Sequence, residues 1–401
     1  MRVTARAART ARQRLAARGA IEPQTATFSA FLGLSYSGSP RAIYEHLLGD
    51  ARFAGWRFTW AFVDPVAAVN QFPSLRDPRT TVVKFRSGDF HRAAARSAWQ
   101  VNNSMPLDYI PTRLGQALVQ TWHGTPFKRL GADVIDATTN ATNSKVEIDD
   151  RYRRAGEQAS YILSSSEFTS EKFASAFLLS SAEAAAKIAE VGNPRNDVLV
   201  RLPIEVRDRT RAKLGVGADR KAILYTPTWR DDSHSSRTGY THTLGADLDV
   251  LRNELGEDHV LLFRAHYLIA HALDFARWGD FVVDVSSYPD INDLYLASDL
   301  LVTDYSSTMF DYAITDKPMA FLMHDLEHYR GTVRGLYFDP SVLPGPVVTD
   351  TADLVAAIRG SDARAEEERV QRAQFRAEYC TWDDGGASAR VAEMMLRGYP
   401  Q

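Results

Sequence analysis

The stretch Leu300-Leu-Val-Thr-Asp-Tyr-Ser-Ser-Thr-Met-Phe-Asp311 predicts the fold class of this chain. Its first three residues are the apolar run of a buried strand. A turn rich in hydroxyl groups follows at 304–307. Apolar residues then recur at helical spacing, namely Met309, Phe310, Ala313 and Ile314. A strand, a short turn and a helix in succession form the repeating unit of a parallel α/β sheet.

The same pattern recurs along most of the chain. Nearly continuous apolar runs, typical of buried parallel strands, are Ala222–Thr226, His259–Phe263, Phe281–Val285, Leu300–Thr303 and Met319–Met323. Strands are also predicted at Thr27–Leu34, Arg57–Val63, Thr81–Phe85, Ala117–Thr121 and Tyr161–Ser164. Helices are predicted at Arg41–Leu48, Arg92–Val101, Ser166–Ala176, Ser181–Ala189 and Ala363–Met395, the last broken near Asp383–Gly386.

A length of 401 residues is enough for two domains. The charged segment Arg195–Gly217 lies between the two groups of strands and is the favoured junction. We therefore expect an α/β protein with two Rossmann-like domains facing a cleft. The first domain is predicted over 25–205, and the second over 206–401 together with the C-terminal helix.

Composition narrows the functional classes. The formal net charge of −3 offers no electrostatic case for binding nucleic acid. The single cysteine, Cys380, excludes an intramolecular disulfide framework and a cysteine-rich metal site, and it fits a reducing cytoplasm. No apolar run reaches the roughly 18 residues that span a bilayer. The N-terminus also lacks the apolar core of a signal peptide.

Residues 1–24 form an arginine-rich segment whose first acidic residue is Glu22. Its basic residues are Arg2, Arg6, Arg9, Arg12, Arg14 and Arg18. One interpretation is a peripheral tether to an anionic membrane, because each basic residue near such a surface adds on the order of 1 kcal/mol. The other is a frayed, solvated tail. Composition alone leaves both open.

A candidate base lies in the segment Thr121-Trp-His-Gly-Thr-Pro-Phe-Lys128, which follows a predicted strand. His123 titrates near neutral pH, and its position places it at the rim of a cleft. Gly124 leaves room for a ligand or a sharp bend and is placed among the predicted donor-binding residues, and Pro126 restricts the exit of the turn. Taken alone, the segment could equally be a structural loop.

A candidate anion site lies between the strand and the helix at 300–311. Ser306 and Ser307 stand where the helix begins, and a helix N-terminus offers unpaired N–H groups to a phosphate. The two serines can alternatively do no more than cap the helix. The carboxyl end of a parallel strand is where α/β proteins bind ligands, which favours the phosphate interpretation.

Two further strand ends carry anion-binding residue types. Arg264 and His266 share one side of an extended chain and together can neutralise a pyrophosphate, although a surface arginine and an ordinary histidine fit the fragment too. Thr226, Thr228 and Arg230 follow the strand Ala222–Thr226 and also suit an oxyanion. Trp229 can stack on a base or belong to the core. The segment Asp231–Gly245 is either a lid or irregular surface.

The sequence indicates no metal cofactor with certainty. The histidines lack the spacing of zinc ligands. Asp304 and Asp311 can reach a divalent cation, although aspartates at a helix start are more often structural. We also place Asp304 among the predicted donor-binding residues. The turn-rich segment Gly192–Asp197 predicts no more than a loop.

Taken together, these segments resemble the CDP-glycerol:poly(glycerophosphate) glycerophosphotransferases, which build and prime teichoic acids and related capsular polymers. The matching motifs occur in one order between about residues 120 and 340: TWHGTPFK (121–128), GNPRNDVL (192–199), YTPTWR (225–230), FRAH (263–266), DINDLYLASDLLVTDYSSTMFDY (290–312) and DKPMAFLMHDLEHYRGTVRGLYFD (316–339). Residues 27–100 match only loosely. The chain departs from the family at Asn193, where an aromatic residue is usual, and at Tyr267, where a proline is usual.

The resemblance implies a GT-B fold that binds the nucleotide mainly through its C-terminal domain. It implies that His123 is the catalytic base, that His266 is needed for activity, and that Ser306 and Ser307 bind the donor phosphates. The implied donor is CDP-glycerol or another CDP-alditol, and the implied acceptor is a lipid-linked saccharide or a growing polymer. The implied location is the cytoplasmic face of the cell membrane. A GT-B sugar-nucleotide glycosyltransferase and a non-catalytic binding module are the alternatives.

Overall fold

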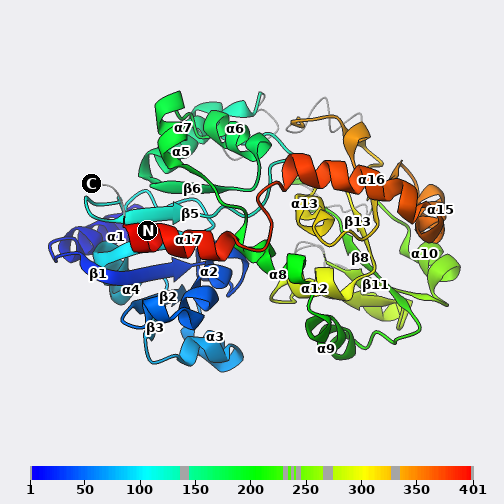
Figure 1. Cartoon of the computed structure of the whole chain (residues 1–401), viewed down its shortest axis with the longest axis horizontal. Helices are drawn as coiled ribbons and strands as arrows, with labels where there is room; N and C mark the ends of the chain where they lie inside the picture. The colour runs from blue at the N-terminus through cyan, green and yellow to red at the C-terminus, as the bar shows by residue number, and fades with distance from the viewer. Residues whose placement is uncertain are drawn as a thin grey trace. The chain divides into compact units, whose positions relative to one another are not determined.

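The computed structural model describes residues 2–135, 144–228, 234–235, 239–240, 245–264, 274–326 and 335–398, with side chains omitted at 2–8, 234–235 and 239–240. The chain divides into two compact units (Figure 1). The first unit comprises Met1–His123, Asp150–Asp197 and Trp382–Gln401. The second comprises Gly124–Asp149 and Val198–Thr381. Each unit is built on one parallel sheet, so the expected α/β class with two Rossmann-like units is confirmed.

The first sheet has seven parallel strands in the order β3-β2-β1-β4-β5-β6-β7. Their bounds are β1 Glu22–Ser29, β2 Arg57–Phe62, β3 Thr80–Lys84, β4 Ser97–Asn102, β5 Ala117–Gln120, β6 Tyr161–Ser164 and β7 Ile188–Glu190. Strand order reverses between β1 and β4. In a doubly wound sheet, ligands bind beyond the carboxyl ends of the strands at such a switch point.

Side chains alternate in direction along each strand, so the apolar residues of the first unit lie in two layers. Phe58, Trp60 and Phe62 of β2 belong to the large core beneath α2 (Gly38–Gly49) and α17 (Ala387–Arg397), whereas the intervening Ala61 packs with the smaller cluster around α4 (Gly88–Arg96). The other helices that include first-unit residues are α1 Arg2–Ala16, α3 Pro65–Gln71, α5 Lys145–Gln158, α6 Glu167–Ala176, α7 Ser181–Lys187 and α8 Asp197–Arg201.

Three predictions in this unit are corrected. The predicted helix Arg92–Val101 ends at Arg96, and Ser97–Asn102 is strand β4, in which Trp99 and Val101 are buried alternately with half-buried residues. The predicted helix Ser181–Ala189 likewise ends at Lys187 and runs into β7. Strand β1 begins before Thr27 and ends at Ser29, because left-handed backbone at residues 31–33 interrupts it.

The second sheet has six parallel strands in the order β12-β11-β8-β13-β14-β15. Their bounds are β8 Lys221–Thr226, β11 His259–Phe263, β12 Val282–Asp284, β13 Leu300–Thr303, β14 Met319–Leu322 and β15 Val347–Val348. The order reverses between β8 and β13. The predicted strands of this half are confirmed to within two residues at each end, and β15 is additional.

Helices and a buried core surround the second sheet. The helices are α9 Ile204–Leu214, α10 Leu248–Leu255, α12 Ile291–Ala297, α13 Thr308–Ala313, α15 Thr351–Arg359 and α16 Ser361–Tyr379. Ile223, Leu261 and Val302 come from three neighbouring strands and pack in one buried cluster. Two short strands, β9 His234–Ser235 and β10 Gly239–Tyr240, pair antiparallel within the predicted polar segment Asp231–Gly245, the rest of which lies largely outside the described residues.

The two units are not contiguous in sequence, unlike the predicted ranges 25–205 and 206–401. The C-terminal helix breaks between α16 and α17, as the pattern near Asp383 predicts. After the break the chain rejoins the first unit, because Val391, Ala392 and Met395 of α17 fill that unit's core. Conversely, the segment after His123 joins the second unit, where Lys128 forms a β-bridge with Leu336.

The segment Gly192–Asp197, predicted only as a loop, anchors α17 to the first unit. The carboxylate of Asp383 accepts hydrogen bonds from the backbone N–H and Nδ2 of Asn193 and from Nδ2 of Asn196. The carboxylate of Asp197 accepts the N–H groups of Ala387 and Ser388 at 2.9 and 2.8 Å. Asp197 therefore caps the start of α17, and Asn193, a departure from the family pattern, supports the fold here.

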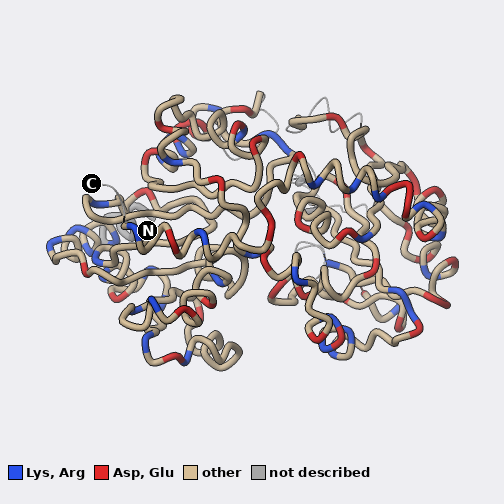
Figure 2. Tube along the Cα trace, viewed as in Figure 1, with Lys and Arg blue, Asp and Glu red and all other residues tan. Residues whose placement is uncertain are grey.

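Charge is unevenly distributed along the helices (Figure 2). Basic residues gather on α1, whereas α16 carries both signs. Helix α1 packs on α4, with Gln13 buried, while Arg12, Arg14 and Arg18 are exposed. None of the helices that the structure describes is long and apolar enough to cross a membrane.

Candidate active site

His123 follows directly after the carboxyl end of β5 in a sharp turn. Trp122, the residue before it, has φ of 50°, which is left-handed and costly for a residue with a Cβ. The side-chain carbonyl of Gln120 accepts the N–H of Trp122 at 2.9 Å and stabilises this turn. The Trp122 indole, buried among Tyr152, Phe173 and Phe177, stacks on the imidazole with the ring centroids 4.5 Å apart.

A backbone carbonyl orients the imidazole of His123. Its Nδ1 lies 2.9 Å from the carbonyl oxygen of Asn103, at the end of β4. Because a carbonyl can only accept, Nδ1 carries the proton and Nε2 keeps its lone pair in the neutral ring. The side-chain oxygen of Asn103 in turn accepts the N–H of Phe31 at 2.8 Å, so that Asn103 joins the ends of β1 and β4 to the histidine.

The protein around His123 lowers the pKa of its imidazole from the usual 6.5. Desolvation by the surrounding protein is the main cause, and the positive charge of Arg195 adds to it. The hydrogen bond to Asn103 opposes the shift but does not reverse it. The side chain still has exposed surface. At neutral pH the ring is therefore uncharged and accessible, as a general base requires.

Three residues with left-handed backbone lie near this histidine. Besides Trp122, Phe31 and Leu32 have left-handed φ values of 46° and 58°. Both side chains are about 41% exposed, and the Phe31 ring centroid lies 6.2 Å from that of His123. Each such residue costs of order 1 kcal/mol or more, and strain of this kind clusters at functional sites. The sequence pattern, which predicted a continuous strand here, had missed this turn.

The second unit gathers hydroxyl groups at its own switch point, between the ends of β8 and β13. The hydroxyl of Thr226 donates to that of Thr303 at 2.9 Å and lies 3.1 Å from that of Thr308. The carboxylate of Asp304 accepts the N–H of Thr228 at 3.0 and 3.1 Å. Thr226 and Asp304 are buried, so these contacts hold the two strand ends together, whereas Thr228 keeps some exposed surface.

The predicted helix start at Ser306 and Ser307 is present, but α13 has only six residues. The Ser306 hydroxyl accepts the N–H of Thr308 at 3.3 Å, whereas the Ser307 side chain makes no capping bond. Both serines are partly exposed. Gly124 lies directly against Ser307, since a Cβ built on Gly124 would overlap the serine hydroxyl and come within 2.8 Å of its Cβ. The residue after the candidate base thus contacts the candidate phosphate site.

Arg264 lies at the end of β11 and braces the loop after β12. Its Nη1 donates to the carbonyls of Val285 and Tyr288 at 3.0 and 2.8 Å, and desolvation by burial lowers the pKa of its guanidinium below the usual range. The predicted donor-binding residue Arg230 and the predicted catalytic residue His266 lie outside the described residues. The donor-binding role of Arg264 stays a prediction, as do those of Gly124, Thr226, Thr228, Asp304 and the two serines.

No group of three or more histidine, cysteine, aspartate or glutamate side chains is arranged to hold a metal ion in the part of the chain that the structure describes. Asp304 and Asp311 are both buried there, and Asp304 is hydrogen-bonded to the backbone of Thr228.

The contact between Gly124 and Ser307 can be tested with a substitution at one residue and a compensating substitution at the other. We expect Gly124→Ala to lower turnover about 100-fold, because displacing catalytic groups by about 1 Å costs that much. Ser307→Gly removes both atoms that the new Cβ would meet, so the double variant should recover part of this loss. Turnover of the four proteins of this cycle measures the coupling, and strictly additive losses would contradict the contact.

Asn103 and Gln120 were not among the predicted site residues. Asn103 bonds His123 across neighbouring strands, whereas Gln120 bonds the backbone of Trp122 within its own segment. The prediction of a helix over Arg92–Val101 hid the strand end at which Asn103 lies. The available signal was the alternation of Trp99 and Val101 with polar residues, which is typical of a strand.

Comparisons with known proteins show the family of the chain. The family model described as CDP-glycerol:poly(glycerophosphate) glycerophosphotransferase matches residues 11–397. A teichoic acid glycerol-phosphate transferase of Staphylococcus aureus is 34% identical over 373 residues, which cover 92% of each chain. A teichoic acid poly(glycerol phosphate) polymerase of Staphylococcus epidermidis is 35% identical over 379 residues. These residues cover 94% of this chain but 51% of the polymerase, so the chain spans about half that relative's length.

Solved structures show the same fold. A structure of the wall teichoic acid polymerase TagF has a TM-score of 0.87 and 33% identity, and covers 97% of this chain and 93% of the TagF chain. A UDP-GlcNAc 2-epimerase from Neisseria meningitidis, at 12% identity and a TM-score of 0.57, shares the fold alone. With a family model matched over nearly the whole chain and a relative 34% identical over 92% of it, the chain belongs to the CDP-glycerol:poly(glycerophosphate) glycerophosphotransferase family.

Proposed function

We propose that this chain transfers an alditol phosphate, most simply glycerol phosphate, from a CDP-alditol to a hydroxyl group of a lipid-linked saccharide or growing polymer, and releases CMP. The observation that carries the proposal is the geometry of His123. An uncharged imidazole has Nδ1 bonded to a carbonyl and its Nε2 lone pair available, in a segment that matches the family motif. Family membership supports the donor class, and a TagF variant soaked with CDPG has been solved.

The proposed reaction is an in-line displacement. The acceptor oxygen forms a bond to the phosphorus that carries the alditol, and the bond from that phosphorus to the bridging oxygen breaks. His123 accepts the acceptor's proton on Nε2, and the electron pair of the broken bond leaves with CMP. General bases contribute about 10²–10⁴-fold to such reactions.

The donor is proposed to bind at the switch point between β8 and β13. Thr228, Ser306 and Ser307 are partly exposed there and offer hydroxyl groups to the phosphates. Arg264, braced by two carbonyls, supplies positive charge from the neighbouring strand β11. His266 is proposed to stabilise the leaving group, and Arg230 to bind the donor. Fixed donors of this kind stabilise charge that develops in the transition state.

The depressed pKa of His123 predicts the pH dependence of the reaction. Only the neutral ring accepts a proton, so kcat/KM should be level near neutral pH and fall as the pH drops through the lowered pKa of His123, below 6.5. The value of kcat/KM falls, and does not rise, on acidification because acid protonates the base. A pH–rate profile between about pH 4.5 and 8 measures it. An acid limb centred above pH 6.5 would contradict the assignment.

Peripheral attachment to an anionic membrane is proposed through the exposed arginines of the N-terminal segment. Arg12, Arg14 and Arg18 face solvent while α1 packs on α4. Sedimentation with phosphatidylglycerol vesicles should retain the protein at low salt and release it as salt rises, whereas phosphatidylcholine vesicles should not retain it. Equal binding to both lipids would contradict this electrostatic attachment.

Product analysis tests the function directly. The protein is incubated with an acceptor and, in separate reactions, with CDP-glycerol, CDP-ribitol or UDP-sugars. Release of CMP with growth of the acceptor by one alditol phosphate is expected. Release of UDP with transfer of a sugar would instead identify a glycosyltransferase. A thermal-shift screen with the same nucleotides identifies the donor independently of turnover, because a bound ligand raises apparent stability.

A further inference from the structure

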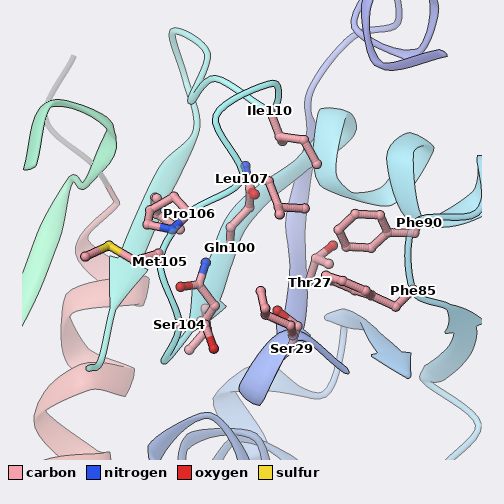
Figure 3. Close-up of a pocket in the computed structure, with 14 residues that line it drawn as sticks. Thr27, Ser29, Phe85, Phe90, Gln100, Ser104, Met105, Pro106, Leu107 and Ile110 are labelled. Carbon is pink, nitrogen blue, oxygen red and sulfur yellow. The ribbon is translucent and has the colours of Figure 1, made fainter. Parts of the chain in front are cut away.

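A small hollow lies against the first sheet near its switch point, lined in part by the C-terminal halves of β1 and β4. Its volume is about 40 Å³. Thr27 and Ser29 of β1 and Gln100 and Asn102 of β4 contribute polar side chains. Figure 3 shows these strands between two apolar walls, with Phe85 and Phe90 on one side and Met105 and Pro106 on the other. All of the lining residues belong to the first unit.

Two chain segments contribute both to the lining of the hollow and to the contacts of the candidate base. Leu32 lines it, and the ring of Phe31, the preceding residue, contacts His123. Asn102 and Ser104 also line it, and Asn103 between them accepts the Nδ1 proton of His123. The hollow therefore begins one residue away from His123's contacts on both segments.

The lining contains no charged side chain. A phosphate placed there would lose its hydration without gaining a counter-ion, which is strongly unfavourable. The side-chain amide of Gln100 and the hydroxyl of Ser29 are half-buried, and within the described residues neither forms a hydrogen bond with another side chain or the backbone. Both side chains keep exposed surface in the hollow, so a ligand that enters it can replace water as their hydrogen-bond partner.

We infer that this hollow is the subsite for the neutral end group of the acceptor, a polyol or sugar terminus that presents its hydroxyl to His123. This inference rests on the proposed function and adds the chemical class of the acceptor's reacting end. Gln100 and Ser29 hydrogen-bond the end group, and Phe85 and Leu107 cover its carbon face. The volume admits a few water-sized groups and therefore a fragment about the size of glycerol. Charged phosphates of the acceptor stay outside.

Steady-state kinetics of Gln100→Leu, which removes the amide at similar size, tests the inference. The acceptor KM should rise about tenfold, because a site built to hydrogen-bond its substrate discriminates strongly when a partner is lost. The kcat and the KM for CDP-glycerol should stay within about twofold of wild type. Gln71→Leu, the same change at an exposed position in α3, is the matched control and should leave every constant unaltered. An unchanged acceptor KM, or an equal rise in the donor KM, would overturn the assignment.

A binding measurement separates this inference from the proposed reaction. Saturation-transfer NMR with glycerol and with N-acetylglucosamine requires no donor and no turnover. Transfer to at least one probe is expected for wild type and Gln71→Leu, and its loss is expected for Gln100→Leu. Equal transfer in all three proteins, or none in wild type, would overturn the subsite even if CMP release is normal. Conversely, absent CMP release with intact, Gln100-dependent probe binding would reject the reaction and retain the subsite.

Discussion

Replacing His123 by asparagine should lower kcat by about 10²–10⁴-fold, which is the usual contribution of a general base. The imidazole has its Nδ1 bonded to Asn103, and the substitution removes the Nε2 lone pair that is proposed to accept the acceptor's proton. The Kd for CDP-glycerol should change little, because the proposed donor site belongs to the second unit. Single-turnover kinetics and calorimetric titration of the donor measure the two quantities separately.

The matched control is His46→Asn, which removes a half-buried histidine from α2. It should retain wild-type turnover. The variant at His123 must also melt cooperatively, since loss of fold would mimic loss of chemistry. Turnover within a few-fold of wild type in a folded His123→Asn protein would reject the base assignment, and the acid limb of the pH profile would then belong to another group.

Replacing Asp383 by alanine should destabilise the protein by about 3 kcal/mol, because hydrogen bonds to a charged group contribute roughly 1.5–3 kcal/mol and orphaned buried donors add their desolvation cost. Asp383 is buried and accepts three donors from Asn193 and Asn196. Its loss would release the anchor between the Gly192–Asp197 segment and the start of α17. Equilibrium denaturation, followed by tryptophan fluorescence, measures the change.

Asp384→Ala is the neighbouring control. Asp384 is exposed and pairs with Arg390 at the surface, where such pairs contribute at most about 1 kcal/mol. The two adjacent aspartates should therefore differ by about 2 kcal/mol in their effects. Equal and small losses would show that the buried contacts of Asp383 do not anchor α17. Activity should follow stability in both variants, because neither residue belongs to the proposed catalytic site.

The local pattern of apolar and polar residues predicted the strand ends at which the candidate site residues lie. Buried parallel strands such as Leu300–Thr303 are continuous apolar runs, and the polar residues that follow them lie at the carboxyl edge of the sheet. His123, Ser306 and Ser307 could be named as candidates for this reason. In β4, by contrast, the buried Trp99 and Val101 alternate with half-buried residues, so the strand has no continuous apolar run. Its sequence was misread as that of a helix for this reason.

The motifs shared with the family identified candidate residues, but the contacts of their side chains are known only from the fold. Asp304 was predicted to bind the donor, and the structure places its carboxylate on the backbone of Thr228. Arg264 was predicted to neutralise a pyrophosphate, and it also braces two carbonyls of the β12–α12 connection. The sequence shows which residue type lies at a strand end. The hydrogen-bond partners of that residue come from other strands and connections, which the local sequence does not show.

The sequence by itself determined the class of fold, the strand ends that carry the candidate residues and the family, because these depend on periodicity and motifs within a few tens of residues. Only the tertiary structure decided how the chain is divided into units, which partner orients His123 and where the neutral hollow lies. Those features depend on contacts between distant residues, such as Phe31 with Asn103 and Asn193 with Asp383. Such contacts form because parallel strands far apart in sequence end at one edge, and because α17 must bury Val391 and Met395.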